Sequence, residues 1–389
     1  MLQRLSRGLR TGFVVALLTV ATYATAQSLR GDHPDTYVVV RGDTLWDIAG
    51  KFLQRPWLWP EIWQANPQIR NPHLIYPGDV ISLAYLDRVN RLTATPGPRT
   101  DAPISAIALD DVEAFLRDLR VLDSFDQLPY VVGLEDDQLR AASGQAVYVR
   151  GLAGQRIGNR YLVVRPTTRY THLTRSGLCC DRIHSDDLDD RGRRTIDFEN
   201  HWTNVVTPDK GNELLGFELV RVSAGTLTRG EVAGIEASTL VLDTADREVR
   251  IGDRLIPVDA QPYDLQFFPH PPKQQTGYGK ARVLAVADNH THGGPRDVIA
   301  ISLGSREGVD NGTVFSIWRE GSNVADRVEV GPDRDEQSVG FNKKVRLPDE
   351  FAGHVMIFRT FDKVSYGLVM DSIKPTRIGY HLKHPDAAY

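Results

Sequence analysis

The chain has 389 residues, 25% of them charged, and its 46 Lys and Arg stand against 50 Asp and Glu, for a formal net charge of −4. This balance argues against electrostatic recognition of nucleic acid or anionic lipid, and the length predicts two to three domains. Two cysteines are too few for the disulfide scaffold of small secreted modules.

Residues 1–26 have the pattern of a cleaved signal peptide. Three arginines precede an apolar run, Gly12–Val20, which leads to Ala24-Thr25-Ala26, an A-x-A cleavage signature. The run is too short for a stable membrane span, with an uncleaved anchor as the alternative, and no later segment approaches a span. We expect an exported, periplasmic, wall-associated protein that begins at Gln27 and has 43 basic and 50 acidic side chains, a net charge of −7.

Residues 36–85 predict a small domain of one strand, two helices and a second strand. The run Thr36–Arg41 alternates as a strand, and Gly42-Asp43 is a turn signal in which Asp43 is the expected helix N-cap. Apolar residues then recur at helical spacing on both sides of Pro56. The turn Tyr76-Pro-Gly78 leads into a closing strand, Asp79–Leu83.

The two ends of this segment, Thr36–Ala49 and Asn71–Leu83, resemble the two ends of a LysM domain. That family binds the N-acetylglucosamine backbone of peptidoglycan and chitin. The resemblance implies a βααβ fold with a glycan groove between the loop after the first strand and the loop before the last. The implied glycan contacts are Gly42, Asp43, Thr44, Leu45, Trp46, Pro72, His73, Leu74, Ile75 and Tyr76.

Several large apolar side chains of this segment are more typical of a core than of a ligand site, because so small a domain has few others to bury. These are Leu45, Ile48, Trp59, Ile62 and Trp63. Trp57 has two interpretations, a staple at the helix entrance or an exposed surface on which a sugar ring stacks.

A linker over residues 86–108 is predicted from its Thr, Ala, Pro and Gly content around Leu92–Pro103. Behind Asp110-Asp111, apolar residues at helical spacing, from Val112 to Leu122, predict one amphipathic helix within 109–128.

Residues 129–389 consist of short apolar and β-branched runs punctuated by Gly and Asp, such as Ala146–Arg150. This pattern predicts a mostly antiparallel β region, with two subdomains at about 129–262 and 275–389 as one possibility. The fold class expected for the whole chain is therefore α+β and multidomain.

A Gly-centred turn before a strand recurs at Gln155–Val164, Val249–Val258 and Glu307–Ile317. Three small β units built on one plan are the predicted cause, and common hairpin turns are the alternative. The third copy, Leu303–Gly312, also resembles the C-terminal domain of the flagellar assembly protein T family.

No catalytic constellation of a wall hydrolase is complete, so we expect no enzymatic activity, no metal and no cofactor. His290-Thr-His292 has the spacing of a zinc pair without a third ligand, and the Asp-rich stretch Asp181–Arg194 lacks calcium-loop spacing. The segment Ser176–Cys180 lacks the intervening His and Gly of an L,D-transpeptidase, and its setting is too acidic for a thiolate nucleophile. Cys179 and Cys180 could form a vicinal disulfide, pair with another chain or stay reduced.

The order of signal peptide, LysM domain, Pro-containing linker and β region resembles the TsaP-like LysM proteins, which are secretin-associated factors of type IV pili. The resemblance implies that the LysM domain grips peptidoglycan while the C-terminal region meets an outer-membrane secretin or another envelope protein. Two weak contacts joined by one linker would reinforce each other through effective concentration. The alternatives are a peptidoglycan-remodelling enzyme or hydrolase activator, and a general wall-binding organiser of the envelope.

Overall fold

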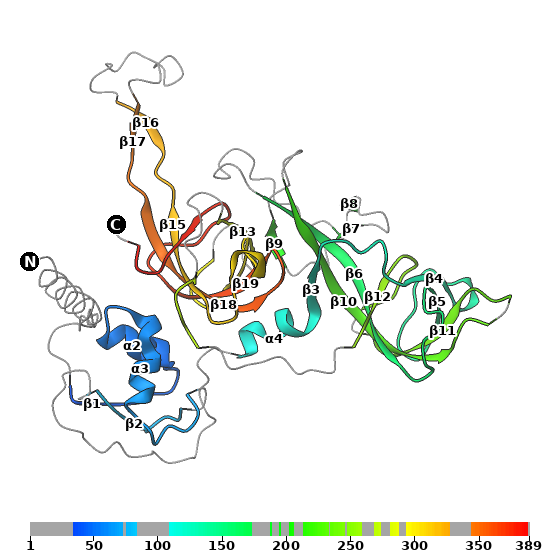
Figure 1. Ribbon diagram of the computed structural model, residues 1–389, viewed down its shortest axis with the longest axis horizontal. Coiled ribbons are helices and arrows are strands. Elements are labelled where there is room, and N and C mark those ends of the chain that lie inside the picture. Colours follow the sequence, from blue (N-terminus) through cyan, green and yellow to red (C-terminus); the bar gives the residue numbers. More distant parts are fainter. Residues whose placement is uncertain are drawn as a thin grey trace, which may run out of the picture. The chain divides into compact units, whose positions relative to one another are not determined.

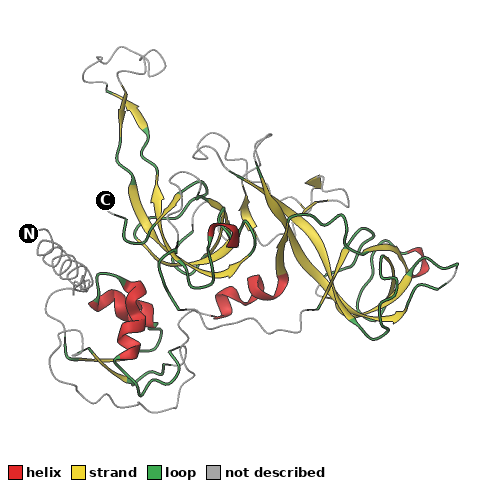
Figure 2. Cartoon of the chain, in the orientation of Figure 1, coloured by secondary structure: helices red, strands yellow, loops and turns green. Residues whose placement is uncertain are grey.

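The computed structural model forms two compact units, residues 1–106 and 107–389 (Figure 1). The residues that it describes are 34–72, 75–83, 109–172, 187–188, 194–195, 202–205, 213–232, 234–245, 247–258, 268–273, 281–287, 293–326 and 344–387. The predicted signal peptide and the predicted linker lie outside these residues. Strands dominate the second unit (Figure 2), and no helix in the described part of the chain is long and apolar enough to cross a membrane.

The first unit has a two-stranded antiparallel sheet and two α-helices. Strand β1 (Thr36–Val38) pairs with β2 (Val80–Ser82), and helix α2 (Leu45–Phe52) packs against the 3-10 turn η1 (Pro56–Leu58) and helix α3 (Trp59–Gln64). This arrangement is the predicted βααβ order. Strand β1 is shorter than the alternating run predicted.

Helix α2 begins one residue later than predicted, because Thr44 and not Asp43 is its N-cap. The Thr44 hydroxyl accepts a hydrogen bond from the Asp47 amide at 3.1 Å, and the Asp47 carboxylate accepts one from the Thr44 amide at 3.1 Å. This reciprocal pair is a capping box.

The core of the first unit contains the tryptophans on both sides of the Pro56 break. Trp57 is 5% exposed, and Trp46 and Trp59 are buried as well. Trp57 is therefore a core residue, and its interpretation as an exposed stacking surface is wrong. The buried side-chain amide of Asn66 donates to the Ser82 carbonyl at 2.9 Å, and its oxygen accepts from the Ser82 backbone amide at 2.8 Å. These two bonds join the end of α3 to β2.

Six strands of the second unit close into a barrel, called barrel 1. They pair in the order β11-β5-β4-β12-β6-β10, and an additional β10–β11 pairing completes the ring. Their bounds are β4 (Tyr130–Leu134), β5 (Ala146–Arg150), β6 (Arg160–Thr171), β10 (Leu214–Arg229), β11 (Ser238–Ala245) and β12 (Arg254–Pro257).

Six later strands close into barrel 2. They pair in the order β20-β15-β18-β19-β14-β13, and backbone hydrogen bonds from Val283 to Tyr380 and from Leu382 to Ala281, both 3.0 Å, join β13 to the β20 segment. Their bounds are β13 (Val283–Ala287), β14 (Val298–Ile301), β15 (Val314–Arg319), β18 (Glu350–Thr360), β19 (Ser365–Ser372) and β20 (His381–Lys383). Each barrel encloses its own cluster of buried aliphatic and aromatic side chains.

The two barrels have the same topology. When the strands of each barrel are numbered 1 to 6 along the chain, both rings run 1-2-5-4-3-6. Strands 4 and 5 of both barrels also interrupt their pairing at two corresponding places, after Ala224 and Leu227 in barrel 1 and after His354 and Ile357 in barrel 2. The chain therefore contains one barrel plan twice.

This duplication corrects the prediction of three β units. The first and third recurring turns precede strand 3 of barrels 1 and 2, and the Gly158 and Gly312 amides donate to corresponding carbonyls on strand 4, at 2.8 and 2.7 Å. The second turn, at Gly252, precedes strand 6 of barrel 1, and its counterpart in barrel 2 is at Gly379.

The remaining elements flank the barrels. They are α4 (Leu109–Asp118), β3 (Leu119–Leu122), η3 (Glu135–Asp137), β7 (Asp187–Leu188), β8 (Arg194–Thr195), β9 (Trp202–Val205), η4 (Ser305–Glu307), β16 (Asn323–Ala325) and β17 (Lys344–Arg346). Strand β3 pairs with β10, β9 pairs with β13, and β16 pairs with β17 as a hairpin that rises from barrel 2, called the arm (Figure 1).

The predicted helix within 109–128 is wrong beyond Asp118. Leu119 and Leu122 continue the helical spacing, but both belong to β3, which pairs antiparallel with residues Phe217–Val220 of β10. Pairing with a strand almost a hundred residues away outweighs the local periodicity, and Leu119 is fully buried in the resulting sheet.

Candidate functional site

The first loop of the LysM-like unit, residues 40–44, turns the chain from β1 into α2. The Asp43 amide donates to the Val40 carbonyl at 3.1 Å, and Gly42 has φ +94°, a conformation that favours glycine. A Cβ built at Gly42 would meet no heavy atom within 4 Å. The outer side of this turn is therefore open, and its backbone is accessible to a ligand.

Asp43 holds this loop to helix α2. Its carboxylate accepts from the Tyr37 hydroxyl at 2.8 Å, the Val40 amide at 2.9 Å and the Lys51 ammonium at 2.8 Å. Burial pushes the pKa of Asp43 upward, but the hydrogen bonds from Lys51, Val40 and Tyr37 outweigh it and hold the pKa below its ordinary value. The ionised Asp43 carboxylate thus links the loop to β1 and α2. Because these three donors engage it, it does not cap the helix.

The closing loop before β2 is fastened to the end of β1. The Tyr76 amide donates to the Asp79 carboxylate at 3.0 Å, and the Asp79 amide donates back to the Tyr76 carbonyl at 3.0 Å. Val39 accepts from the Gly78 amide at 2.8 Å and donates to the Asp79 carbonyl at 2.9 Å. Because Val39 directly precedes the first loop, both loops are anchored at the same point of the sheet.

The predicted glycan contacts differ in what they expose. Gly42 is exposed, Asp43, Thr44 and Tyr76 are half-buried, and His73 and Leu74 lie outside the described residues. The others have buried side chains: Leu45, Trp46, Pro72 and Ile75. Buried side chains leave only the backbone for a ligand, so these four residues could contribute carbonyl or amide groups or shape the wall. The assignment of all ten residues to a glycan site stays a prediction.

Sequence reasoning missed Tyr37, Lys51 and Asp79 as residues that position the loops. Lys51 also donates to the Tyr37 hydroxyl at 2.6 Å and lies over the Tyr37 ring, 4.7 Å from its centroid. A signal was present for Lys51, since it stands in the last turn of α2, where the helix dipole favours a cation.

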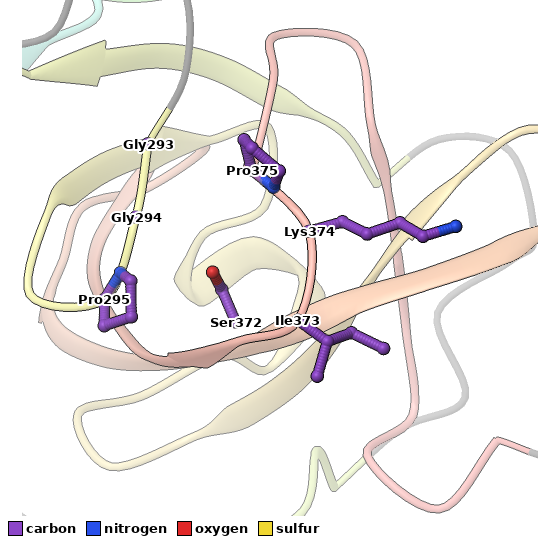
Figure 3. A pocket seen from close by; sticks show the side chains of 7 residues that line it. All are labelled: Gly293, Gly294, Pro295, Ser372, Ile373, Lys374 and Pro375. Carbon is purple, nitrogen blue, oxygen red and sulfur yellow. The ribbon is translucent and has the colours of Figure 1, made fainter.

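For the other candidate sites of the sequence, the structure describes no side-chain arrangement. His290, His292 and the segment Ser176–Cys180 lie outside the described residues, and within Asp181–Arg194 only strand positions are described. A depression of about 350 Å³ on barrel 2 is lined by Gly293, Gly294, Pro295, Ser372, Ile373, Lys374 and Pro375 (Figure 3). Two of its polar groups are already engaged, because the Gly294 amide donates to Asp297 and Lys374 donates to Glu350.

Comparison with known proteins agrees with the geometry of the first unit. Over 60 residues the chain is 42% identical to the uncharacterized protein YqbP of Bacillus subtilis (strain 168), a match that covers 13% of this chain and 27% of that protein. The chain thus spans about a quarter of the length of this curated relative. Residues 37–84 match the family model of the LysM domain, so this protein carries a LysM domain near its N-terminus. The presence of this domain supports glycan binding.

Proposed function

We propose that this chain is an exported, non-catalytic protein of the periplasm that binds the glycan strands of peptidoglycan and tethers an envelope protein to the wall. The LysM domain at residues 37–84 is the observation that carries this proposal. Its two loops are anchored at one point of the sheet, and the turn at Gly42 offers backbone amide and carbonyl groups without a covering side chain.

The electrostatics of the loops favour a neutral ligand. Asp43 and Lys51 neutralise each other at 2.8 Å, and Thr44 and Asp47 satisfy each other in the capping box. A sugar with hydroxyl and acetamido groups needs hydrogen-bond partners and an apolar wall, and it gains little from net charge. Binding should therefore survive high salt, which screens exposed charges but leaves hydrogen bonds and apolar contacts.

In this proposal the second unit is the part of the chain that binds the tethered envelope protein. Its two closed barrels are much larger than a sugar module requires, and an outer-membrane secretin of a type IV pilus is the partner that the TsaP-like resemblance implies. Joining a glycan contact and a protein contact in one chain raises the effective concentration of each for the other.

Sedimentation with insoluble peptidoglycan tests the proposal. The chain without its predicted signal peptide should pellet with peptidoglycan in low and high salt, and it should leave a peptidoglycan gel uncleared in zymography. Clearing of the gel would show that the protein degrades peptidoglycan, and the tether proposal would give way to that of a wall-remodelling enzyme. Loss of pelleting in high salt would indicate that the protein binds the charged stem peptides of peptidoglycan and not its neutral glycan strands. Co-purification of a secretin with residues 107–389 would support a secretin as the partner. Secretin binding that requires the LysM domain would contradict the assignment of protein binding to the second unit.

A further inference from the structure

Strand β13, the first strand of barrel 2, has a third neighbour. Besides β14 and the β20 segment, it pairs with β9 through Ala285, Val286 and Ala287, which lie opposite Val205, Asn204 and Trp202. Strand β9 belongs to the connection between strands 3 and 4 of barrel 1. Barrel 2 therefore accepts a strand from a loop of the preceding barrel.

Strand β4, the first strand of barrel 1, is the counterpart of β13. The Val131 amide donates to the Asp253 carbonyl at 2.8 Å and its carbonyl accepts from the Gly252 amide at 2.9 Å. The bonds of Val283 with Tyr380 and Gly379 repeat this pattern at 3.0 and 2.8 Å.

The two strands also share an irregularity. Pairing with strand 2 is interrupted after Val131 in barrel 1 and after Val283 in barrel 2. Gly133 and Leu134 thus correspond to Ala285 and Val286 of β13. Glu135, the counterpart of Ala287, begins the 3-10 turn η3, where its carbonyl accepts from the Gln138 amide at 3.2 Å. In the described part of the chain, no strand pairs with this edge of β4 beyond Tyr130.

The exposure of neighbouring side chains fits an open edge. Val132, on the outside of barrel 1, is 44% exposed, whereas the corresponding Leu284 beside β9 is 3% exposed. Ile251 is 61% exposed, and its counterpart Ile378 is packed against the core of barrel 2. An apolar pair beside an unpaired strand edge is the surface that an added strand covers.

The arm occupies in barrel 2 the place that β9 and the β7–β8 hairpin occupy in barrel 1, between strands 3 and 4. Its strand β17 is exposed at all three residues, and it pairs with β16 alone in the described part of the chain. Val345 is 51% exposed between two basic side chains, Lys344 and Arg346. Strand β4 leads directly into the 3-10 turn η3, whose first two residues, Glu135 and Asp136, are exposed and acidic, so the charge at this end of β4 is complementary to that of β17.

We propose that the β4 edge at Gly133–Leu134 accepts strand β17 from a second copy of this chain, as β13 accepts β9, so that copies associate head to tail. The interface is heterologous, because an edge on one copy meets an arm on the next. The association is independent of the glycan site and of any secretin.

Sedimentation equilibrium of the chain without its predicted signal peptide tests this assembly. The wild type should show a mass that rises with concentration beyond a dimer. Val132→Lys places a charge beside the β4 edge, and Val345→Asp places a negative charge on β17, where it would meet the acidic Glu135 and Asp136 without removing a donor of the β16–β17 pairing. Each change should weaken self-association about tenfold or more. Val258→Lys changes a valine that is 40% exposed elsewhere on barrel 1, and it should associate like the wild type.

Mixing distinguishes head-to-tail pairing from any symmetric contact. The Val132→Lys chain keeps its arm and the Val345→Asp chain keeps its edge, so together they should form 1:1 dimers and stop there. Circular dichroism and thermal melting establish that each variant is folded. A wild type that stays monomeric, edge and arm variants that associate like the wild type, or a mixture that stays monomeric would each overturn the proposal, while glycan sedimentation would be unaffected.

Discussion

Tyr366 of barrel 2 donates a 2.6 Å hydrogen bond to the carboxylate of Glu218, which is fully buried on β10. The Tyr170 hydroxyl donates to the same oxygen at 2.7 Å, and the hydroxyls of Thr167 and Thr168 donate to the other oxygen at 3.2 and 3.3 Å. Burial, reinforced by the Glu218 charge, raises the pKa of both tyrosines well above the ordinary value, so both remain donors. Four hydroxyls thus compensate one buried charge where the barrels meet.

Removal of one donor tests this junction. Tyr366→Phe should lower the free energy of unfolding by about 1.5–3 kcal/mol, because a buried carboxylate loses a charge-assisted hydrogen bond. Tyr161→Phe is the matched control, since the Tyr161 hydroxyl donates to the neutral Gln155 side chain at 3.3 Å and should cost about 1 kcal/mol or less. Urea unfolding followed by circular dichroism measures both. Equal losses in the two variants would show that the carboxylate has no special role.

Local sequence patterns predicted the elements of the LysM domain but not all of their ends. Asp43 and Thr44 are both good N-cap residues, and the choice between them depends on Lys51 and Tyr37, which engage Asp43 from the helix and the strand. The end of α4 after Asp118 likewise depends on a distant strand, β10. Such contacts between residues far apart in sequence are not encoded in a helical period.

The barrels were beyond sequence reasoning for a related reason. Turns at Gly158 and Gly312 are visible as Gly-centred motifs, so their recurrence could be predicted. Which strands the turns bring together could not, because closure depends on pairings such as β10 with β11 and on register shifts within them. The same motif also precedes strands at different positions in the ring, so the sequence predicts three units where the structure has two barrels.

A bulky side chain at Gly42 should block glycan binding without unfolding the domain. Gly42→Trp places an indole on the open side of the first loop, where no atom lies within 4 Å of a built Cβ. Gly42→Asn is the control, because it keeps a non-glycine residue at φ +94° but adds little bulk. Asn is one of the residues that most often adopt a positive φ. We expect peptidoglycan sedimentation to be lost in the first variant and retained in the second. Equal binding by both, in folded proteins, would move the site away from this loop.

Loss of the Lys51 ammonium should loosen the first loop. In Lys51→Met the Asp43 carboxylate keeps Tyr37 and the Val40 amide as donors but loses its cation, so the pKa of Asp43 should rise and amide exchange in residues 40–43 should quicken. Nuclear magnetic resonance measures both. Lys374→Met is the control, because Lys374 has the same 45% side-chain exposure and pairs with Glu350 on barrel 2. Unchanged exchange in the Lys51 variant would contradict the positioning role of this contact.

The base of the arm should resist acid down to unusually low pH. Burial pushes the pKa of Asp349 upward, but the Gly321 amide at 3.0 Å, the Lys383 ammonium at 2.8 Å and the Arg346 guanidinium outweigh it and lower the pKa to about 2. A lowered pKa means that the ionised carboxylate stabilises the fold above its ordinary value near 3.8, and that this contribution is lost as the pH falls through about 2.

Asp349→Asn isolates this contribution. The variant should unfold more easily than the wild type at neutral pH, and the difference should shrink as the pH falls from about 4 towards 2, because the wild-type carboxyl then becomes neutral as well. Glu350→Gln, which changes the adjacent and more exposed carboxylate, should produce a smaller difference. Thermal melting of the three proteins across this pH range measures the effect. A difference between Asp349→Asn and the wild type that persists unchanged at pH 2 would mean that the side chain acts through hydrogen bonding or packing and not through its charge.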